Sequence, residues 1–390
     1  MSPPPASRNN QLRVAVVGGG VIGLACGLEL RARGAQVAVY ERGLELGAGA
    51  TARSAGMLGA AFEWGLEEDQ LALAALARRA GDIWPEFAER VERLGGGSVE
   101  FSGEGAIVVA RNASEVGWID HLAAACQARG LPVQRLSAAE LKRQEPSITT
   151  SAPAGLLLQG DRQVDAQQVL LRLAAALSRS GVGLRMGRSV DRVMVGADFL
   201  MPDGEAFDRL VLATGVGAAE VRFVGRKGGA LETGLAPIVP VKGQLLALAP
   251  VNSGPTHVIH ARDVYIAPKA RWTLVGATTE RGSADTSVDR AAIEALRAKA
   301  VALAPALAAA PEISSWAGVR PGTPDDAPMI GETAIAGVFA ALGMYRNGVL
   351  FAPAVAELVA QAVIDGKVSG SAAAFAPARF DNLAKAPHSP

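Results

Sequence analysis

The sequence predicts an α/β (α+β) fold in which a domain built on a parallel sheet is interrupted by a second, mostly antiparallel β domain. Three observations support this prediction. A continuous apolar run near the N-terminus precedes a glycine-rich turn and a helical pattern. After residue 238 the chain changes to short segments with alternating apolar and polar residues. A further buried run, followed by a helical pattern, returns near the C-terminus and can rejoin the first sheet.

The first segment, residues 13–42, has the pattern of a strand, a turn, a helix and a second strand. Val14–Val17 is an apolar run of strand length, and Gly34 ends the helical pattern that follows the turn. Gln36–Tyr40 is the second strand, and Glu41 stands at its carboxyl end. This arrangement is typical of a Rossmann-like dinucleotide-binding unit.

Each residue of the turn has a mechanical role in such a unit. Gly18 allows a tight turn, Gly20 lets the backbone approach a pyrophosphate, and Gly23 permits close packing of helix on strand. The N-terminus of the helix offers N–H groups and a positive dipole end to phosphates. Glu41 can accept hydrogen bonds from a ribose diol, which favours an adenosine without a 2′-phosphate.

This motif alone does not separate NAD from FAD, but the next segment does. Residues 47–58, GAGATARSAGML, are small residues with Thr51, Arg53 and Ser54 among them, where a nicotinamide enzyme normally continues into another plain βα unit. In flavoproteins of this layout the chain here runs beside the pyrophosphate and ring of the cofactor. Thr214 and Gly215, at the end of the strand in residues 208–215, are a second and less specific flavoprotein signal.

The remaining elements follow from periodicity and turn residues. A turn is expected at 202–204, and a short helix capped by Ser137 within 137–148. Helices are expected at 68–93, 116–129, within 160–182, at 288–304 and from about 349; strands are expected at 106–110, 183–186, 190–195, 208–215, 313–321 and 338–342.

These elements suggest a discontinuous domain organisation. Residues 1–11 have no apolar core and are expected to form a disordered tail. The cofactor domain is expected to comprise 12–60, 151–220 and 330–375, and the substrate-binding domain 61–150 and 221–329.

Composition excludes several classes of protein. Lysine plus arginine balance aspartate plus glutamate at 38 each, so no basic excess favours a nucleic-acid partner. The longest uncharged run, residues 14–28, is too short and too rich in glycine to span a membrane. Cys26 and Cys126 both lie in apolar helical patterns, which indicates a reducing compartment and a cytoplasmic location. The histidines and cysteines show no catalytic triad and no metal-ligand spacing.

Eight segments together carry a resemblance to a known family over nearly the whole chain. They are VVGGGVIG, SAGMLGA, PVKGQ, VYIAP, VGATTE, WAGVRPGTPD, MIG and YRNGVLFAP, in this order. The series resembles the D-amino-acid-oxidase-like family of FAD enzymes. This resemblance implies a Rossmann-like FAD-binding domain with an inserted substrate domain. It also implies that FAD is lined by Val21, Ile22, Glu41, Arg42, Ala50, Thr51, Ala55, Gly56, Met57, Val190 and the run Met344, Tyr345, Arg346, Asn347, Gly348, Val349 and Leu350.

The same resemblance assigns the substrate side. Arg320 corresponds to the arginine that holds a substrate carboxylate, Tyr265 to its hydroxyl partner, and Arg346 to a second arginine near the substrate and the ring. Met57 and Met344 could narrow the cavity. The implied activity is oxidation of glycine and other small amines, with O₂ as oxidant and no catalytic acid or base required. Covalent flavin in this family uses a cysteine or histidine near the ring; neither cysteine lies in the matching segments, so noncovalent FAD is expected. The resembling enzymes are tetramers, which implies a homo-oligomer.

Three positions depart from the family pattern. Met344 stands where histidine is common, Lys269 begins KARW where the family has an Arg-x-x-Gly pattern, and Asp326 stands where glycine is frequent. The first could reshape the mouth of the substrate pocket. The other two are expected to be loop variation.

Other interpretations of these residues remain open at this stage. Both arginines could pair with the local acids Asp325, Asp326 or Glu332, and Tyr265 could be a core tyrosine. Two other functions fit the same motifs. One is an amino-acid dehydrogenase that passes electrons to a quinone or a protein partner, including cyanide-forming glycine dehydrogenases. The other is a non-catalytic FAD-binding protein.

Overall fold

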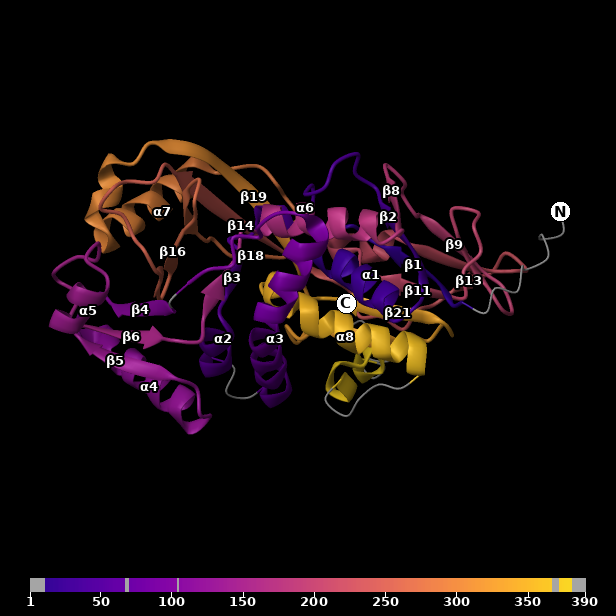
Figure 1. Cartoon of the computed structure of the whole chain (residues 1–390), viewed down its shortest axis with the longest axis horizontal. Helices are drawn as coiled ribbons and strands as arrows, with labels where there is room; N and C mark the ends of the chain where they lie inside the picture. The colour runs from indigo at the N-terminus through magenta and orange to yellow at the C-terminus, as the bar shows by residue number, and fades with distance from the viewer. Residues whose placement is uncertain (1–10, 67–69, 104, 367–371, 381–390) are drawn as a thin grey trace, which may run out of the picture.

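The computed structural model describes residues 11–66, 70–103, 105–366 and 372–380. Residues 1–10 of the predicted N-terminal tail, and the first two residues of the helix expected at 68–93, lie outside the described residues. The molecule is elongated, with two sheet assemblies side by side along its length (Figure 1).

A six-stranded sheet forms the core of one half of the molecule. Its strand order is β20-β21-β11-β1-β2-β8, and its strands pair in parallel except for β20 with β21. The strands are β1 (Arg13–Val17), β2 (Gln36–Glu41), β8 (Gly183–Met186), β11 (Arg209–Leu212), β20 (Met329–Glu332) and β21 (Val338–Leu342). The predicted return of the C-terminal segment to the first sheet is therefore confirmed.

The alternation of side chains along β1 explains the layers around this sheet. Val14 and Val16 share a core with four helices that pack on one another, whereas Ala15 and Val17 face a small second sheet. The helices are α1 (Val21–Ala32), α3 (Leu71–Gly95), α6 (Ala166–Arg179) and α8 (Gly348–Asp365); the small sheet has the order β10-β9-β12-β13 and contains β9 (Arg192–Val195), β10 (Leu200–Pro202), β12 (Arg222–Gly225) and β13 (Ala230–Leu231).

A nine-stranded, mostly antiparallel sheet forms the other half. Its path is β18-β14-β17-β16-β15-β4-β6-β5, with β19 paired along β14 over almost its full length. Its strands are β4 (Ala106–Ala110), β5 (Val133–Ser137), β6 (Ala154–Leu158), β14 (Val239–Leu248), β15 (Val258–Ala261), β16 (Val264–Pro268), β17 (Thr273–Gly276), β18 (Glu280–Arg281) and β19 (Glu312–Gly322). The change to antiparallel texture after residue 238 is confirmed.

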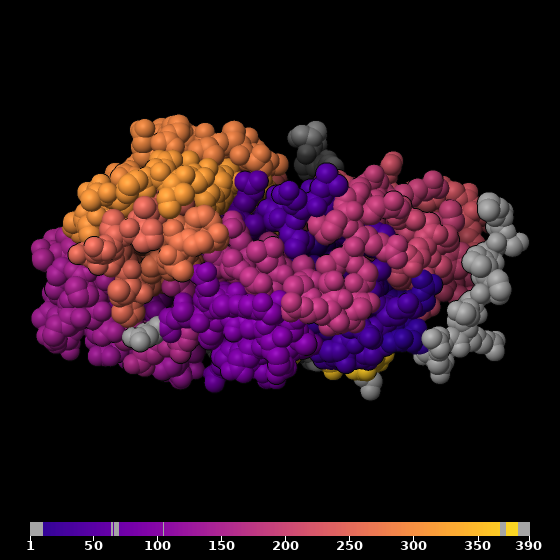
Figure 2. Space-filling view, turned by 45° about the horizontal axis from the view of Figure 1, so that its top comes forward, coloured from indigo at the N-terminus to yellow at the C-terminus, as the bar shows by residue number. Residues whose placement is uncertain are grey.

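Helices cover both faces of this larger sheet. On one face α7 (Arg290–Leu303) and α5 (Ala138–Gln144) pack over the sheet, and on part of the other face α4 (Val116–Ala128) does so. The short helix α2 (Ala60–Leu66) contacts α3 and α4 and so bridges the two halves. Figure 2 shows the division on the surface, with the orange segments gathered over the magenta ones at one end.

Four elements lie elsewhere than the predicted domain boundaries place them. The helix α3 shares a core with β1, α6 and α8, because its buried face is a long apolar stripe that includes Leu76 and Trp84. The strand β6 pairs with β4 and β5 in the large sheet, and β12 and β13 extend the small sheet through β9. Periodicity predicts such elements but not their partners, since pairing is decided by contacts distant in sequence. The exact domain boundaries stay a prediction.

The helix α8 is apolar and long enough to cross a membrane by composition alone, but two thirds of it (67%) is buried inside the protein. It packs against α1 and α3. Its apolar character is therefore accounted for by the core of the fold.

Candidate active site

A cavity of about 870 Å³ runs between the six-stranded and the nine-stranded sheets. One end lies against the glycine turn after β1, and the other lies against the face of β14–β17. Of the residues expected to contact a cofactor or substrate, all but Gly23 and Leu350 line it: Gly18, Gly20, Val21, Ile22, Glu41, Arg42, Ala50, Thr51, Ala55, Gly56, Met57, Val190, Thr214, Gly215, Tyr265, Arg320, Met344, Tyr345, Arg346, Asn347, Gly348 and Val349.

The two residues outside the cavity have packing roles. A Cβ atom on Gly23 would lie 1.9 Å from the carbonyl oxygen of Gly18, so Gly23 holds the helix against the turn as the motif predicts. Leu350 is buried in the core shared by the helices, and its carbonyl accepts a hydrogen bond of 2.8 Å from Trp84 Nε1; its contact with FAD stays a prediction. Leu350 is the third residue of α8 and is buried, whereas Gly348 and Val349 before it line the cavity.

The glycine turn has no room for side chains where the strand meets the helix. Gly18 has a φ of +118°, and a Cβ there would lie 2.3 Å from the carbonyl oxygen of Ala213. A Cβ on Gly20 would meet only Thr51 Oγ1, at 3.5 Å, so the backbone at Gly20 faces open space in the cavity. This combination suits the close approach of a diphosphate.

The acidic residue after β2 is held in place by the backbone. Glu41 accepts hydrogen bonds of 2.8 Å from the N–H of Gly19 on one carboxylate oxygen and from the N–H of Gly43 on the other. Each carboxylate oxygen can accept more than one hydrogen bond, so capacity remains for a ribose diol. Thr51 Oγ1 accepts a hydrogen bond of 3.2 Å from the Val21 N–H, which joins the small-residue segment to the start of α1.

At the nucleotide end of the cavity, a buried polar atom that has no partner among the described residues tests the fit of a nucleotide cofactor. Thr214 Oγ1 is buried without a hydrogen-bond partner, and Thr214 lines the cavity next to the glycine turn. A buried hydroxyl without a partner is costly unless a ligand or water satisfies it. The open turn, the remaining capacity of Glu41 and this hydroxyl therefore fit a dinucleotide such as FAD.

The substrate end is built by cross-strand register. The residues His260, Tyr265 and Gly276 are directly paired across β15, β16 and β17, and Gly276 pairs with Leu245 of β14. Cross-strand partners share a face of the sheet. Arg320 is directly paired with Val241, which lies on the same face as Leu245 because their spacing is even. Register thus brings residues from five strands onto one wall of the cavity.

Two glycines make room for the polar side chains on that wall. A Cβ on Gly243 would lie 2.3 Å from two guanidinium nitrogens of Arg320, and a Cβ on Gly276 would lie 2.5 Å from the hydroxyl of Tyr265. Both side chains therefore lie flat over backbone that lacks side chains. Gly243 of PVKGQ and Gly276 of VGATTE are therefore glycines because any larger side chain would clash with Arg320 or Tyr265.

The contacts of Arg320 within the described chain are to carbonyl oxygens, not to carboxylates. Its Nη1 donates to the carbonyl of Thr278 at 3.2 Å and, weakly, to that of Lys242 at 3.5 Å. A guanidinium has five donors, so capacity for a bidentate carboxylate remains. The alternative in which Arg320 pairs with a local acid is not supported.

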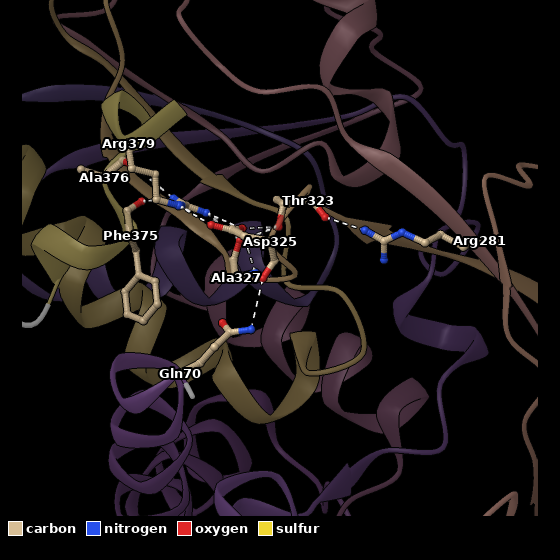
Figure 3. Close-up of polar contacts among 8 residues, drawn as sticks. All are labelled: Gln70, Arg281, Thr323, Asp325, Ala327, Phe375, Ala376 and Arg379. Atoms are coloured by element: carbon tan, nitrogen blue, oxygen red, sulfur yellow. Dashed lines mark hydrogen bonds and ion pairs between the residues drawn. The ribbon is translucent and has the colours of Figure 1, made fainter. Parts of the chain in front are cut away.

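The local acids named in that alternative have other partners. Asp325 binds Arg379 through two hydrogen bonds of 2.8 and 3.1 Å, which ties the loop after β19 to the C-terminal segment (Figure 3). Asp326 pairs with Arg281 at 2.8 Å, and Glu332 accepts a hydrogen bond from the N–H of Gly337. Asp326 also has a φ of +57°, a conformation that favours glycine.

Arg346 differs from Arg320 because it is paired with a carboxylate that the sequence analysis missed. Its Nη2 and Nε lie 2.9 and 3.1 Å from Oε2 of Glu63 on α2, and Asn347 Nδ2 donates to the same oxygen at 3.0 Å. Glu63 is buried and lines the cavity. Its position six residues after Met57, in an otherwise apolar segment, was the available signal.

Burial changes the ionisation of the other polar residues on this wall. Burial raises the pKa of Tyr265 to about 12, against the opposing effect of the nearby Arg320, so its hydroxyl keeps its proton at neutral pH. Burial, together with the charge of Arg346, lowers the pKa of His260 to about 4. His260 is stacked on Phe62 with ring centroids 4.1 Å apart. Neither His260 nor Phe62 was expected at the site.

The cysteines lie away from the cavity. Cys26 and Cys126 are free and buried, and neither lines the cavity. Burial raises the pKa of both thiols, to about 12 and about 11. Among the residues that the structure describes, no group of three or more His, Cys, Asp or Glu side chains is arranged to hold a metal ion.

Comparison with known proteins agrees with this geometry. Residues 13–362 match the family model described as FAD dependent oxidoreductase, DAO. A glycine oxidase of Geobacillus kaustophilus is 34% identical over 90% of this chain and 92% of that protein. The crystal structure of glycine oxidase from the same organism superposes with a TM-score of 0.85, at 32% identity over 95% of this chain and 99% of that one.

Two other relatives carry different names. A bifunctional protein ThiO/ThiG of Trichormus variabilis is 29% identical over 95% of this chain, which matches 55% of that protein. The hydrogen cyanide synthase subunit HcnC of Pseudomonas aeruginosa is 27% identical over 95% of this chain and 97% of that protein.

The fold, the cavity and these matches define a class of redox enzyme that uses a flavin dinucleotide. The chain belongs to the DAO family of FAD-dependent oxidoreductases, and within that family it is similar to glycine oxidases. Its cofactor is FAD.

Proposed function

We propose that this enzyme oxidises glycine and other small amines, giving glyoxylate, ammonia and H₂O₂ from glycine. The observation that carries the proposal is Arg320: a guanidinium on the cavity wall whose contacts are two carbonyl oxygens and which keeps donors for a carboxylate. FAD, when bound, supplies the hydride acceptor for the α-carbon of the substrate.

Arg320 and Tyr265 would fix the substrate by its carboxylate. The planar guanidinium can donate two parallel hydrogen bonds, and the protonated hydroxyl of Tyr265 can donate a third. Holding the carboxylate leaves the α-carbon little freedom, so its C–H keeps one direction in the cavity. Positioning of this kind lowers the entropic part of the barrier.

The chemistry requires little else from the protein. Hydride transfer from a neutral amine needs no protein nucleophile and no obligatory general base, since the amine loses its proton before the transfer. His260 is uncharged at neutral pH and lies beside Phe62. Both side chains narrow the cavity, which favours a small substrate.

The oxidant distinguishes this proposal from its main alternative. The relative named hydrogen cyanide synthase subunit, at 27% identity, favours a second candidate: an amino-acid dehydrogenase that passes electrons to a quinone or protein partner. The glycine oxidase relatives, at up to 34% identity, support O₂ as the oxidant.

We further propose that FAD is noncovalent and that the enzyme is cytoplasmic and homo-oligomeric. We also propose that it serves thiamine synthesis, as the ThiO name of one relative suggests.

The test uses the purified holoenzyme. Glycine added without O₂ should bleach the yellow flavin absorbance, and readmission of air should restore it with formation of one H₂O₂ per glyoxylate. Bleaching that air fails to reverse would support the dehydrogenase. A flavin that stays oxidised with glycine, sarcosine and D-alanine would overturn the proposal. Acid precipitation should leave the yellow colour in the supernatant; colour in the pellet would show a covalent flavin.

A further inference from the structure

The two arginines at the substrate end of the cavity have different electrostatic surroundings. Arg320 contacts only carbonyl oxygens within the described chain, so its charge is not neutralised by a contacting acid. Arg346 contacts the carboxylate of Glu63 through both Nε and Nη2. Of these two arginines, Arg320 therefore presents a full positive charge to ligands, whereas Arg346 belongs to an ion pair whose net charge is close to zero.

The carboxylate of Glu63 is fixed by its surroundings. Asp161 is buried and accepts hydrogen bonds of 2.7 and 3.2 Å from the N–H groups of Ala61 and Phe62, which anchors the first turn of α2. Asn347 donates to Glu63 from the other side at 3.0 Å. The side chain of Glu63 is only 10% exposed, so solvent screens its ion pair with Arg346 poorly.

The other charged residues near the cavity do not take the place of Glu63. At the rim, Asp263 is held by Arg111 at 2.7 Å and Lys299 at 2.8 Å, so its charge is already compensated. Arg53 donates to the carbonyl of Ala317, on the side of the cavity next to the small-residue segment. Glu63 is thus the buried carboxylate that lies among the substrate-facing residues Phe62, Tyr265, His260 and Arg346.

We propose that Glu63 is a specificity-determining residue that restricts the enzyme to amines with a single carboxylate. This inference rests on the proposed function, in which Arg320 holds that carboxylate. A second carboxylate on the substrate would enter the part of the cavity beside Arg346. Because Glu63 already occupies and neutralises that guanidinium, the second carboxylate finds no uncompensated positive charge there and lies close to the carboxylate of Glu63.

The experiment removes the charge and keeps the shape. In the holoenzyme, Glu63→Gln should raise the ratio of kcat/KM for iminodiacetate to kcat/KM for glycine at least tenfold. A readout without turnover uses two unreactive ligands, glycolate with one carboxylate and diglycolate with two, titrated by the change in flavin absorbance. The ratio of their dissociation constants, diglycolate over glycolate, should fall at least tenfold in the variant.

Two further variants keep the inference open to disproof. Glu63→Asp retains the charge and should retain the wild-type ratios, even if the shorter side chain lowers both activities. Glu29→Gln removes a glutamate of α1 that lies outside the cavity and is paired with Arg33 and with Arg90 of α3; it should leave the ratios unchanged. Wild-type ratios in a folded Glu63→Gln enzyme would overturn the inference. Glycolate that failed to bind the wild type would instead overturn the proposed function.

Discussion

The two ends of the cavity are built in opposite ways. At the nucleotide end, the glycine turn and Glu41 come from one segment of about 30 residues, and the contacts that hold them are short in sequence: Gly18 with Gly23, Gly19 with Glu41. At the substrate end, Arg320, Tyr265 and Glu63 come from segments more than 50 residues apart, and sheet register and the helix α2 bring them together.

This difference shows where each kind of binding is encoded. A turn that must approach a diphosphate is specified by local backbone geometry, so it appears as a motif. A pocket that must fit a small substrate is specified by which side chains face each other across a sheet, so single residues can change it without changing the fold. The predictions below test the two ends separately.

The largest effect is expected from Gly23→Ala at the nucleotide end. The added Cβ would lie 1.9 Å from the carbonyl oxygen of Gly18, so α1 must move away from the turn. FAD affinity should fall by at least about a hundredfold, an effect of about 3 kcal/mol. Equilibrium dialysis and the ratio of flavin to protein absorbance measure it. Gly117→Ala is the control, since nothing lies within 4 Å of its Cβ position. Normal FAD content in Gly23→Ala would contradict the packing role.

At the substrate end, Arg320→Ala should lower kcat/KM for glycine by two to three decades, which corresponds to roughly 2–4 kcal/mol for lost charge-assisted hydrogen bonds. Arg320→Lys should fall between wild type and alanine because it keeps the charge but not the fork geometry. Glycolate should inhibit the wild type competitively and lose that effect in the alanine variant.

The matched control for that variant is Arg281→Ala, which removes an arginine that pairs with Asp326 outside the cavity. It should leave kcat/KM nearly unchanged. FAD content should stay normal in both variants. Loss of FAD from Arg320→Ala, or normal glycolate binding by it, would show that Arg320 has a structural role instead.

A smaller effect is expected on the pH dependence of folding stability, through His260 at the substrate end. The pKa of His260 is lowered to about 4 from 6.5, so between these values the unfolded chain takes up a proton that the folded chain does not. The free energy of unfolding should therefore be highest above pH 6.5 and should fall as the pH falls towards 4. His260 should account for a loss of about 1–2 kcal/mol between pH 7 and 5. Denaturant unfolding with saturating FAD measures it. His260→Phe should show a shallower decline; an identical decline would contradict the assignment.

The smallest effect is expected from Tyr265→Phe. This change removes one hydroxyl that lies over Gly276 and keeps the ring, so it should cost about 0.5–1.5 kcal/mol, or about a two- to twelvefold rise in KM for glycine. The affinity for FAD should be unaffected because the hydroxyl lies at the substrate end. A KM equal to that of the wild type would show that Tyr265 serves only to pack the sheet.

The sequence by itself determined the fold class, the turn at Gly18–Gly23 and the position of Glu41, because period, turn chemistry and strand length depend on neighbours along the chain. It also predicted the return of the strand at 338–342 to the first sheet, since buried runs of that kind need a parallel sheet. The antiparallel strands after residue 238 could be predicted because alternating apolar and polar residues are typical of antiparallel sheets with one buried face.

Only the tertiary structure decided the rest of the substrate end. No local pattern indicates that Glu63 neutralises Arg346, that His260 stacks on Phe62, or that Gly243 leaves room for Arg320, because each contact joins residues at least 77 positions apart. The same limit misplaced α3, whose apolar stripe fits either half of the molecule until its partners α6 and α8 are known. Pairing across a sheet and packing between helices are settled by the whole chain, since many alternatives have similar local energies.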